Sequence, residues 1–550
     1  MTPSSGVAPR RPSGGVDLLL TNATVASMRP SRPPDEAVAI IGERIAWVGS
    51  AADARRELGP IGRTVDLGGA TVLPGFIDAH NHLILLGHWL NQVDCSASAV
   101  RSIPDIVDAI AARSRTVPAG TWIEGHGYDD TRLTERRHPS RTDLDAATPD
   151  HPVLIHHISG HMSVVNSRGL ELAGIGHGTP DPVGGRVDRD PSSWEPTGLL
   201  QEQAQTLLPV PFTPQEPGAL LESLRSGGRA YLEAGVTSSH EAGIFSPPEL
   251  GAFQTAWAEG WLAQRTYLMF RIDFVPWIEA LGLQGGFGDA RLRFGAIKLV
   301  ADGSLIGRTA AVSEPFLDDP APDNIGMLTI PPDELHDLIS RGHGLGWQMA
   351  VHAIGDRAIE TTLDGFERAM ARLPRPDPRH RIEHCGVLRP DLIRRIGQLG
   401  VIPVSQPPFI TEFGDGFLRH LGHARCQLTY PLRAFLKAGI PVAGSSDSPV
   451  SSHRPLLGIQ AAVTERTADG AEFAPAERLT AEEAIRMYTI HAAHASFDER
   501  DKGTIEPGKL ADLVVLGHDP MTVAPEAIAS IPVLATVVGG VFVYERPMAE

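Results

Sequence analysis

Histidine, lysine and aspartate side chains end or interrupt several short apolar segments, and their types suit a metal site. The spacing His-x-His in GFIDAHNH is the most direct case, because residues i and i+2 of a strand point the same way and can reach one ion. Imidazole and carboxylate suit zinc or a similar divalent ion, and no thiolate is required. A lone histidine of this kind is more often a hydrogen-bonded core residue. Six such residues, each at an expected strand, favour a metal site: His80, His82, Lys298, His352, His384 and Asp447.

Lys298 lies inside the apolar run GAIKLVAD, where an ammonium group is costly to bury without a partner. One interpretation is structural: a salt bridge to Asp302, or a side chain that extends to the rim of the fold. The other is chemical. Burial favours the neutral amine, which can react with CO₂ to form a carbamate, and that anion can bridge two metal ions as a carboxylate would.

Other polar residues give weaker indications. His161, in the segment SGH, is expected to reach the pocket and bind substrate, although a packing role is about as well supported. His240 ends another expected strand and could line the pocket, but nothing marks it as a ligand. The segments GHGYDD (125–130) and TGLLQEQ (197–203) stand out, and the sequence assigns no role to them.

The elements that would position these residues follow a repeating pattern of a short apolar run, a polar residue at its end, and a helical stretch. This alternation is typical of βα units around a buried parallel sheet. One of nine strand-like runs, PVLIHHI (152–158), lies in a long stretch rich in Pro, Gly and charge, and the other eight suit a (β/α)₈ TIM-like barrel. Active sites of such barrels lie where the carboxyl ends of the strands converge. The eight runs are 75–80, 235–241, 265–272, 295–302, 348–353, 381–385, 401–406 and 441–447.

Both ends of the chain differ from this βα pattern, because they consist of β-rich segments separated by Gly-containing turns. Neither end has enough strands to be stable alone, so they are expected to pair into one small β-sandwich. The predicted domains are a disordered leader at 1–15, a sandwich of 16–72 and 503–545, a metal-binding barrel of 73–90 and 231–502, and an inserted subdomain at 91–230.

Composition narrows the class of protein. The 550 residues carry a net charge of −18, which argues against nucleic acid and anionic membrane as partners because both need basic patches. The three cysteines, Cys95, Cys385 and Cys426, form no C-x-x-C pair, so a thiolate zinc site is not expected. No signal peptide or membrane span is predicted. We expect a cytoplasmic protein with a small-molecule substrate, and a homo-oligomer is left open.

Several motifs, in order along the chain, resemble those of the metal-dependent amidohydrolase superfamily. LPGFIDAHNH (73–82) resembles its opening motif, and later metal motifs are matched by KLVADGSL (298–305), VHAIGDRAI (351–359), RIEHC (381–385) and SSDSP (445–449). SGHMSVVNSRGL (159–170) and EPGKLADLVVL (506–516) are similar to segments of amidohydrolase family 3, the group that includes N-substituted formamide deformylases. The order of the motifs is specific for the superfamily and far less so for substrate.

The resemblance implies a hydrolase that cleaves a C–N bond of an amide-type small molecule with a metal-bound hydroxide. One or two divalent ions, expected to be Zn²⁺, would be held by His80, His82 and Asp447 and by His352 and His384, with carboxylated Lys298 bridging them. Asp447 would also be catalytic, taking a proton from the nucleophile and passing it to the leaving amine. His161 would bind substrate.

Three alternatives stay open. Deaminases of the superfamily with one metal usually carry Glu three residues beyond the fifth-strand histidine, and this chain has Gly355 there, followed by Asp356. A mononuclear amidase and a cyclic-amide hydrolase of the same superfamily also stay open. A non-catalytic barrel scaffold is disfavoured because the full ligand set is present, although fold alone does not fix function.

Overall fold

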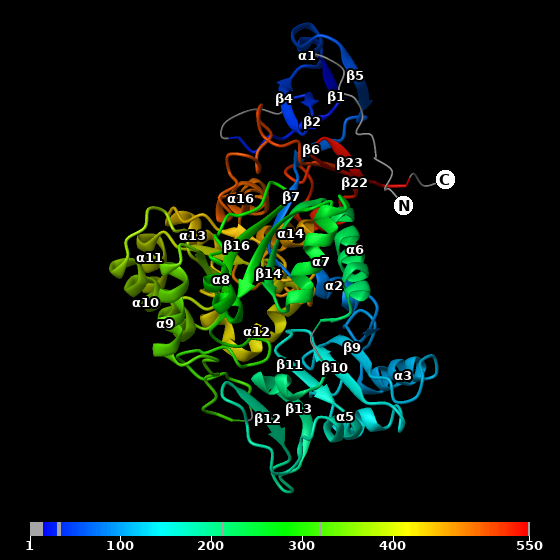
Figure 1. The fold of residues 1–550 in the computed structure, drawn as a ribbon, viewed down its shortest axis with the longest axis vertical. Helices are drawn as coiled ribbons and strands as arrows, with labels where there is room; N and C mark the ends of the chain where they lie inside the picture. The colour runs from blue at the N-terminus through cyan, green and yellow to red at the C-terminus, as the bar shows by residue number, and fades with distance from the viewer. Residues whose placement is uncertain (1–14, 30–34, 211–212, 320, 548–550) are drawn as a thin grey trace.

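The computed structural model describes residues 15–29, 35–210, 213–319 and 321–547, so the predicted leader lies, apart from Gly15, outside the described residues. Eight parallel strands form one sheet at the centre of the molecule (Figure 1). In order around the sheet they are β7 (Phe76–Asn81), β14 (Val236–Ile244), β15 (Arg265–Arg271), β16 (Leu292–Val300), β17 (Gln348–Ala353), β18 (Arg381–His384), β19 (Ile402–Ser405) and β20 (Ala443–Gly444).

The sheet is nearly closed, because the loop after β20 returns to β7. The Asp447 amide donates to the carbonyl oxygen of His80 at 2.8 Å, and the His82 amide donates to that of Ser448 at 2.8 Å. The strands are buried on both faces, which explains their near-continuous apolar runs.

Helices surround this sheet, and most of them present an apolar face to it. In α10, for example, buried residues recur every three or four positions, as the helical period requires. The covering helices are α2 (Leu83–Trp89), α6 (Pro217–Glu233), α7 (Pro247–Ala258), α8 (Val275–Leu281), α9 (Pro332–Gly344), α10 (Asp356–Arg372), α11 (Pro390–Leu399), α12 (Pro408–Cys426), α13 (Leu432–Lys437), α14 (Pro455–Thr464), α15 (Ala481–Arg486) and α16 (Ala492–Ala495).

A second sheet of six strands is inserted between the first two barrel strands, and in Figure 1 it lies at the opposite end of the barrel from the terminal sheets. The ninth strand-like run, 152–158, contains β10 of this sheet and not a barrel strand. The sheet has the order β12 (Gly185–Arg189), β13 (Pro196–Glu202), β11 (Met162–Val165), β10 (Val153–His157), β9 (Ile123–Tyr128) and β8 (Val93–Asp94), with helices α3 (Ile103–Ser114), α4 (Arg141–Asp145) and α5 (Ser167–Leu172).

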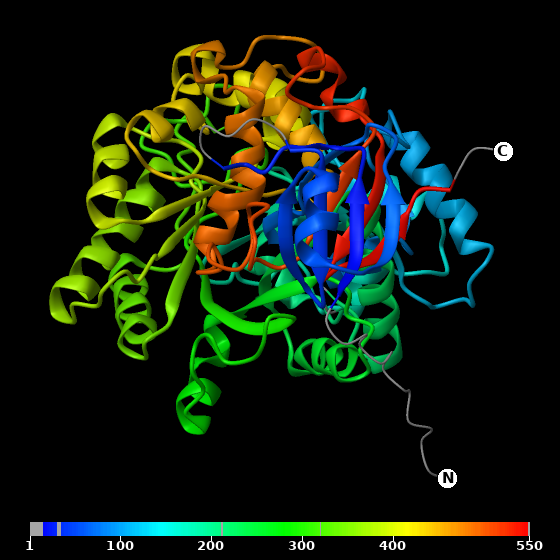
Figure 2. The same ribbon diagram turned by 90° about the horizontal axis from the view of Figure 1, so that it is seen from above.

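The two chain ends meet in a pair of small sheets, seen side by side in Figure 2. β6 (Thr71–Pro74) pairs antiparallel with β21 (Leu513–Leu516), so residues more than 400 positions apart share one sheet. That sheet also holds β2 (Thr24–Val25), β22 (Val533–Val538) and β23 (Val541–Glu545). The other holds β4 (Arg44–Gly49), β3 (Ala37–Ile41), β1 (Val16–Thr21) and β5 (Ile61–Asp66), with α1 (Ala51–Leu58) beside it.

One apolar cluster joins the two terminal sheets, with Leu20 and Ile40 from one and Val72 and Val515 from the other. The predicted fold class is therefore confirmed: a (β/α)₈ barrel, a β-sandwich built from both chain ends, and an inserted subdomain. The residue boundaries of these domains stay a prediction. None of the helices in the described residues combines the length and the apolar character needed to cross a membrane.

Candidate metal centre

The six residues expected as metal ligands all line one cavity of about 1080 Å³. His80, His82 and Asp447 come from the ends of β7 and β20, which the backbone bonds between those ends bring together. His161, which the inserted sheet supplies, lines the same cavity. The structure thus gathers the six expected ligands and His161 at one cavity, with Lys298, His352 and His384 coming from β16, β17 and β18.

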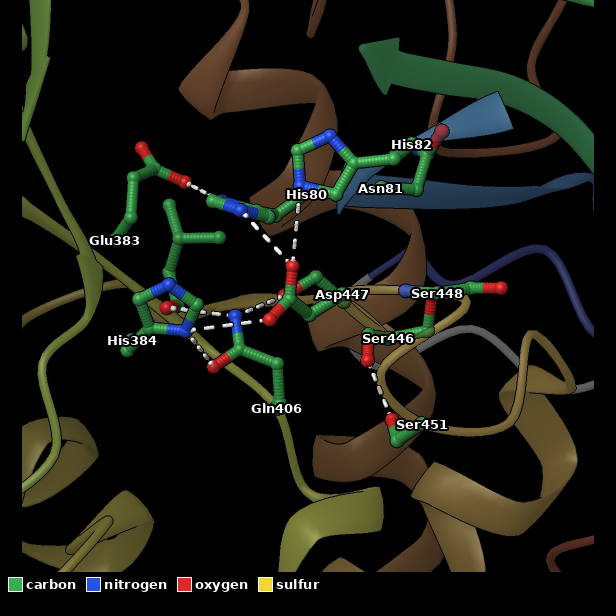
Figure 3. A network of polar contacts seen from close by, with 12 residues as sticks. His80, Asn81, His82, Glu383, His384, Gln406, Ser446, Asp447, Ser448 and Ser451 are labelled. Atoms are coloured by element: carbon green, nitrogen blue, oxygen red, sulfur yellow. Dashed lines mark hydrogen bonds and ion pairs between the residues drawn. The ribbon is translucent and has the colours of Figure 1, made fainter. Parts of the chain in front are cut away.

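Asp447 lies at the centre of the ligand set (Figure 3). Its Oδ1 is 3.3 Å from Nε2 of His80 and 3.4 Å from Nε2 of His82, and its Oδ2 is 4.0 Å from Nδ1 of His384. Ligand atoms of His80, His384 and Asp447 all lie within 4.8 Å of one another, and the three residues are buried. Such a group can hold a divalent ion.

Three of the histidines each have one ring nitrogen engaged with an oxygen. Nδ1 of His80 donates to the carboxylate of Glu383, and Nε2 of His352 donates to the carbonyl of Gly303 at 3.0 Å. Nδ1 of His384 lies 2.9 Å from Oε1 of Gln406, and Figure 3 shows Glu383 and Gln406 reaching the two ligand rings. Since these oxygens only accept, the opposite nitrogen of each ring keeps a lone pair. Metal-binding histidines are typically oriented in this way.

This orientation gives a direct test of whether a metal fits. With its Nδ1 proton on Glu383, His80 offers a lone pair at Nε2, and Oδ1 of Asp447 is another acceptor only 3.3 Å away. Two acceptors at this distance repel each other unless a cation lies with them. Within the described part of the chain, Nδ1 of His82 has no hydrogen-bond partner, and its nearest carboxylate oxygen, on Glu241, is 3.7 Å away. The donor set therefore fits a divalent ion.

Electrostatics favours the ligand form of most of these groups. Burial lowers the pKa of His384 well below its usual range, with His352 adding to the effect. Burial alone would raise the pKa of Asp447, but its contacts with the neighbouring rings of His80 and His82 outweigh burial and hold that pKa well below its usual range. His82 is the exception: burial lowers its pKa, yet Asp447 and Glu241 together raise it to about 9.

Lys298 is buried at the carboxyl end of β16, with 5% of its surface exposed. Burial lowers its pKa to about 8, against an opposing effect of Glu383 and Asp447. The amine is therefore easier to deprotonate than an ordinary lysine, as a nucleophile toward CO₂ must be. Asp302 does not form the salt bridge of the structural alternative. Its carboxylate accepts backbone N–H groups of Ala311, Ile354 and Gly355 instead.

The backbone is strained at two of the candidate ligands. His384 has φ 68° and Asp447 has φ 56°, in the left-handed region that non-glycine residues seldom adopt. Buried Asp78 helps to fix the second of these loops, because it accepts hydrogen bonds from the amide and hydroxyl of Ser446 and from the hydroxyl of Tyr231. Strain of this kind clusters at functional sites.

Other residues lie differently from the sequence expectation. His240 does not line the cavity. It is buried in the barrel interior, where its Nδ1 is 3.2 Å from the guanidinium of Arg381. The functional partners that sequence reasoning missed are Glu383, Gln406 and Glu202. The only signal for Glu383 was a charged residue in a buried strand next to a candidate ligand.

A second group with metal-like geometry lies outside the cavity. Asp129, Asp130 and His157 are buried and close enough to share an ion. However, His157 Nε2 lies 3.2 Å from Asp130, and Arg308 lies 3.8 Å from the other oxygen of the same carboxylate. The charges of this group are thus already balanced by protein side chains.

Comparisons with known proteins agree with this geometry. A sequence profile described as amidohydrolase family matches residues 63–544. An N-substituted formamide deformylase of Arthrobacter pascens is 33% identical over 96% of this chain and 98% of its own length. The protein LONG AFTER FAR-RED 3 of Arabidopsis thaliana is 32% identical over 99% of this chain and 93% of its own. An uncharacterized metal-dependent hydrolase from Pyrococcus furiosus superposes with a TM-score of 0.71 and 31% identity, over 92% of this chain and 100% of that one.

Proposed function

We propose that this chain hydrolyses the amide-type bond of a small molecule in the cavity described above. The chain belongs to the amidohydrolase family and is a metal-dependent hydrolase acting on carbon–nitrogen bonds. The observation that supports this most strongly is the meeting of His80, His384 and Asp447 at that cavity. A cytoplasmic location and the absence of nucleic-acid and membrane partners stay predictions.

The ligand set divides between two positions. His80, His82 and Asp447 would hold one ion, since both imidazoles lie within 3.4 Å of the same carboxylate oxygen. His352 and His384, whose ring centroids are 4.4 Å apart, would hold the second. Nitrogen and oxygen ligands without thiolate suit Zn²⁺. Ions bound there would supply an activated water nucleophile and polarise the scissile carbonyl.

Lys298 would complete the site as a carbamate. The neutral amine nitrogen forms a bond to the carbon of CO₂ and loses a proton, which leaves an anionic carboxylate-like group on a side chain that lines the cavity. The lowered pKa of Lys298, about 8, supports this step because it raises the share of neutral amine. The new anion would balance the positive charge of ions held by the two groups of candidate ligands.

Asp447 would move the proton. Its two oxygens face different histidines, so the carboxylate can accept a proton from the nucleophile and deliver it to the leaving amine without leaving its place. The left-handed backbone of Asp447 and the hydrogen bonds that Ser446 donates to Asp78 limit its movement. His161, from the inserted sheet, would bind the substrate.

The position of Asp356 argues against the deaminase alternative. Its carboxylate accepts hydrogen bonds from the amide and hydroxyl of Ser313 and from Arg389, and it does not line the cavity. It therefore does not replace the glutamate that a mononuclear deaminase places near the fifth-strand histidine.

A substrate panel tests the proposal. Metal-loaded protein is offered N-substituted formamides first, because a full-length relative carries that activity in its name, then N-acyl amino acids, cyclic amides and carbamates. Release of amine from at least one class is expected, and removal of the metal should abolish it. Release of ammonia from aminated heterocycles, with every amide class inert, would favour the deaminase instead.

A further inference from the structure

The segment TGLLQEQ ends β13 at Glu202, directly beside His161. The Glu202 amide donates to the carbonyl oxygen of His161 at 2.8 Å, as the pairing of β13 with β11 continues past Gln201. The side chains meet as well, with Nδ1 of His161 2.7 Å from Oε2 of Glu202. Both residues line the cavity. The inserted sheet thus delivers a His161–Glu202 pair to the metal centre.

Glu202 carries two features that cost stability. Its backbone has φ 51° and ψ −124°, a combination that only glycine adopts easily. Its Oε1 is buried and, among the described residues, has no hydrogen-bond partner. Buried unpaired oxygens are rare in folded proteins and call for a physical explanation. Neither feature is needed to pair β13 with β11, so they point to the carboxylate itself.

The carboxylate of Glu202 also packs against the barrel at Gly303. A Cβ atom at position 303 would lie 2.3 Å from Oε1 of Glu202 and 2.1 Å from Oγ1 of Thr309, so both side chains lie close against this glycine. The carbonyl of Gly303 accepts the ring N–H of His352, and the rings of His161 and His352 lie 5.1 Å apart. Glu202 therefore lies between the pocket histidine and the backbone that orients a candidate ligand.

A carboxylate only accepts hydrogen bonds, so the contact with Glu202 places a proton on Nδ1 of His161. Nε2 is then the nitrogen of the His161 ring that is free to contact a bound molecule. We propose that Glu202 is a positioning residue for the hydrolytic reaction: it anchors Nδ1 of His161 and thereby directs Nε2 at the substrate. This inference rests on the proposed function only for its kinetic consequence, because the orientation of His161 exists without substrate.

Steady-state kinetics tests the coupling between Glu202 and His161. The variants compared are Glu202→Gln, His161→Gln and the double variant. Each single change is expected to lower kcat/KM by about 10–100-fold, the usual effect of losing a partner that orients an active-site group. Metal content should stay at the wild-type value. Because Glu202 acts through His161, the double variant should be no slower than His161→Gln alone. Multiplied losses in the double variant would overturn the proposal.

Glu124→Gln is the matched control. Glu124 lies in β9 of the same inserted sheet, accepts a hydrogen bond from Gln92 at 3.0 Å and lies 3.6 Å from Nε2 of His88, but it does not line the cavity. Its replacement should leave kcat/KM within about 3-fold of wild type, since substitutions far from a site seldom affect it strongly. An equal loss in Glu124→Gln would mean that the sheet, and not the pair, is at fault.

Nuclear magnetic resonance of ¹⁵N-histidine protein tests the same idea without substrate. The His161 signals are those missing in His161→Gln. Wild type and Glu124→Gln should show a proton on Nδ1 of His161, and Glu202→Gln should lose it or mix it with the Nε2–H form. An unchanged signal in Glu202→Gln would contradict the positioning role. If wild type hydrolyses no amide, the proposed function fails, while this measurement still decides the role of Glu202.

Discussion

Two clusters of aspartate and histidine pass the same distance test for a metal site, yet their surroundings differ. The ligand cluster (His80, His384, Asp447) ends barrel strands and lines a large cavity. The junction cluster (Asp129, Asp130, His157) lies where the inserted sheet meets the barrel, away from the cavity lining. Both are buried, so burial does not distinguish them.

The difference is in what already balances their charge. In the junction cluster, Asp130 faces His157 and Arg308, and Thr131 donates its amide and hydroxyl to Asp129. In the ligand cluster, the ring proton of His80 points away to Glu383, so its lone pair at Nε2 faces Oδ1 of Asp447. Proximity of ligands is thus not enough. Acceptors that face one another without a proton between them indicate a cation.

The strongest test of this comparison is Asp447→Asn. The amide cannot carry the proton and is a weaker ligand, so we expect kcat/KM to fall by about 10⁴-fold, at the upper end for loss of an acid–base group. Assays with the best amide of the substrate panel measure it. Activity within about tenfold of wild type would place the proton transfer elsewhere.

Lys298→Arg should have the next largest effect. Arginine stays protonated and cannot form a carbamate, so a cation would replace the proposed carbamate anion and the second of the two proposed ions should be lost, with a decrease of about 10³-fold in rate. Lys298→Ala should be comparably slow, but a short carboxylic acid can refill the space and restore part of the rate. Wild-type activity in Lys298→Arg would make this residue a structural cation.

Glu383→Gln sharpens the comparison at the first histidine. Burial raises the pKa of Glu383, but Arg381 and His80 outweigh it and lower that pKa to about 2, so a full negative charge faces the ring of His80. Without that charge the orientation of His80 should weaken, with metal affinity and kcat/KM lowered by about 10–100-fold. Titration with Zn²⁺ measures the affinity, and an unchanged affinity would show that His80 is held by other contacts.

Asp130→Asn is expected to change activity least, by less than about 3-fold, but to reduce stability. Breaking a buried ion pair costs about 3 kcal/mol of unfolding free energy. Burial alone would raise the pKa of Asp130, but His138, His157 and Arg308 hold it well below its usual range. Its stabilisation is therefore present above about pH 4 and lost as the pH falls through the lowered value. The difference between the thermal midpoints of wild type and variant should shrink progressively as the pH falls below about 4, and a difference that stays constant over that range would exclude this charge effect.

The barrel, and the meeting of the candidate ligands at one cavity, were predictable because they depend on local patterns. A short apolar run ending in a polar residue predicts a barrel strand whose end faces the site, and this placed His80, Lys298 and His352 at one cavity. The unusual run 152–158 could be set aside because its neighbours were rich in Pro, Gly and charge. It contains β10 of the inserted sheet.

The partners of these ligands could not be predicted. Glu383 reaches His80 across about 300 residues of sequence, and the carbonyl that orients His352 belongs to a loop. Both contacts depend on where strands and loops lie in space. The positive φ of Glu202 could not be predicted from the sequence either. Glutamate disfavours that backbone geometry, and only the surrounding sheet imposes it. His240 shows the converse, since a strand-end position alone did not bring it to the cavity.

Elemental analysis of protein purified without chelator tests the central claim most directly. The account predicts one to two divalent ions per chain in wild type, the same content in Asp130→Asn, and a clear loss in Asp447→Asn. Stripping the metal should abolish amide hydrolysis, and Zn²⁺ or a similar divalent ion should restore it. A chain that contains no metal and keeps its full activity, or a metal that is lost with Asp130 and not with Asp447, would contradict the account.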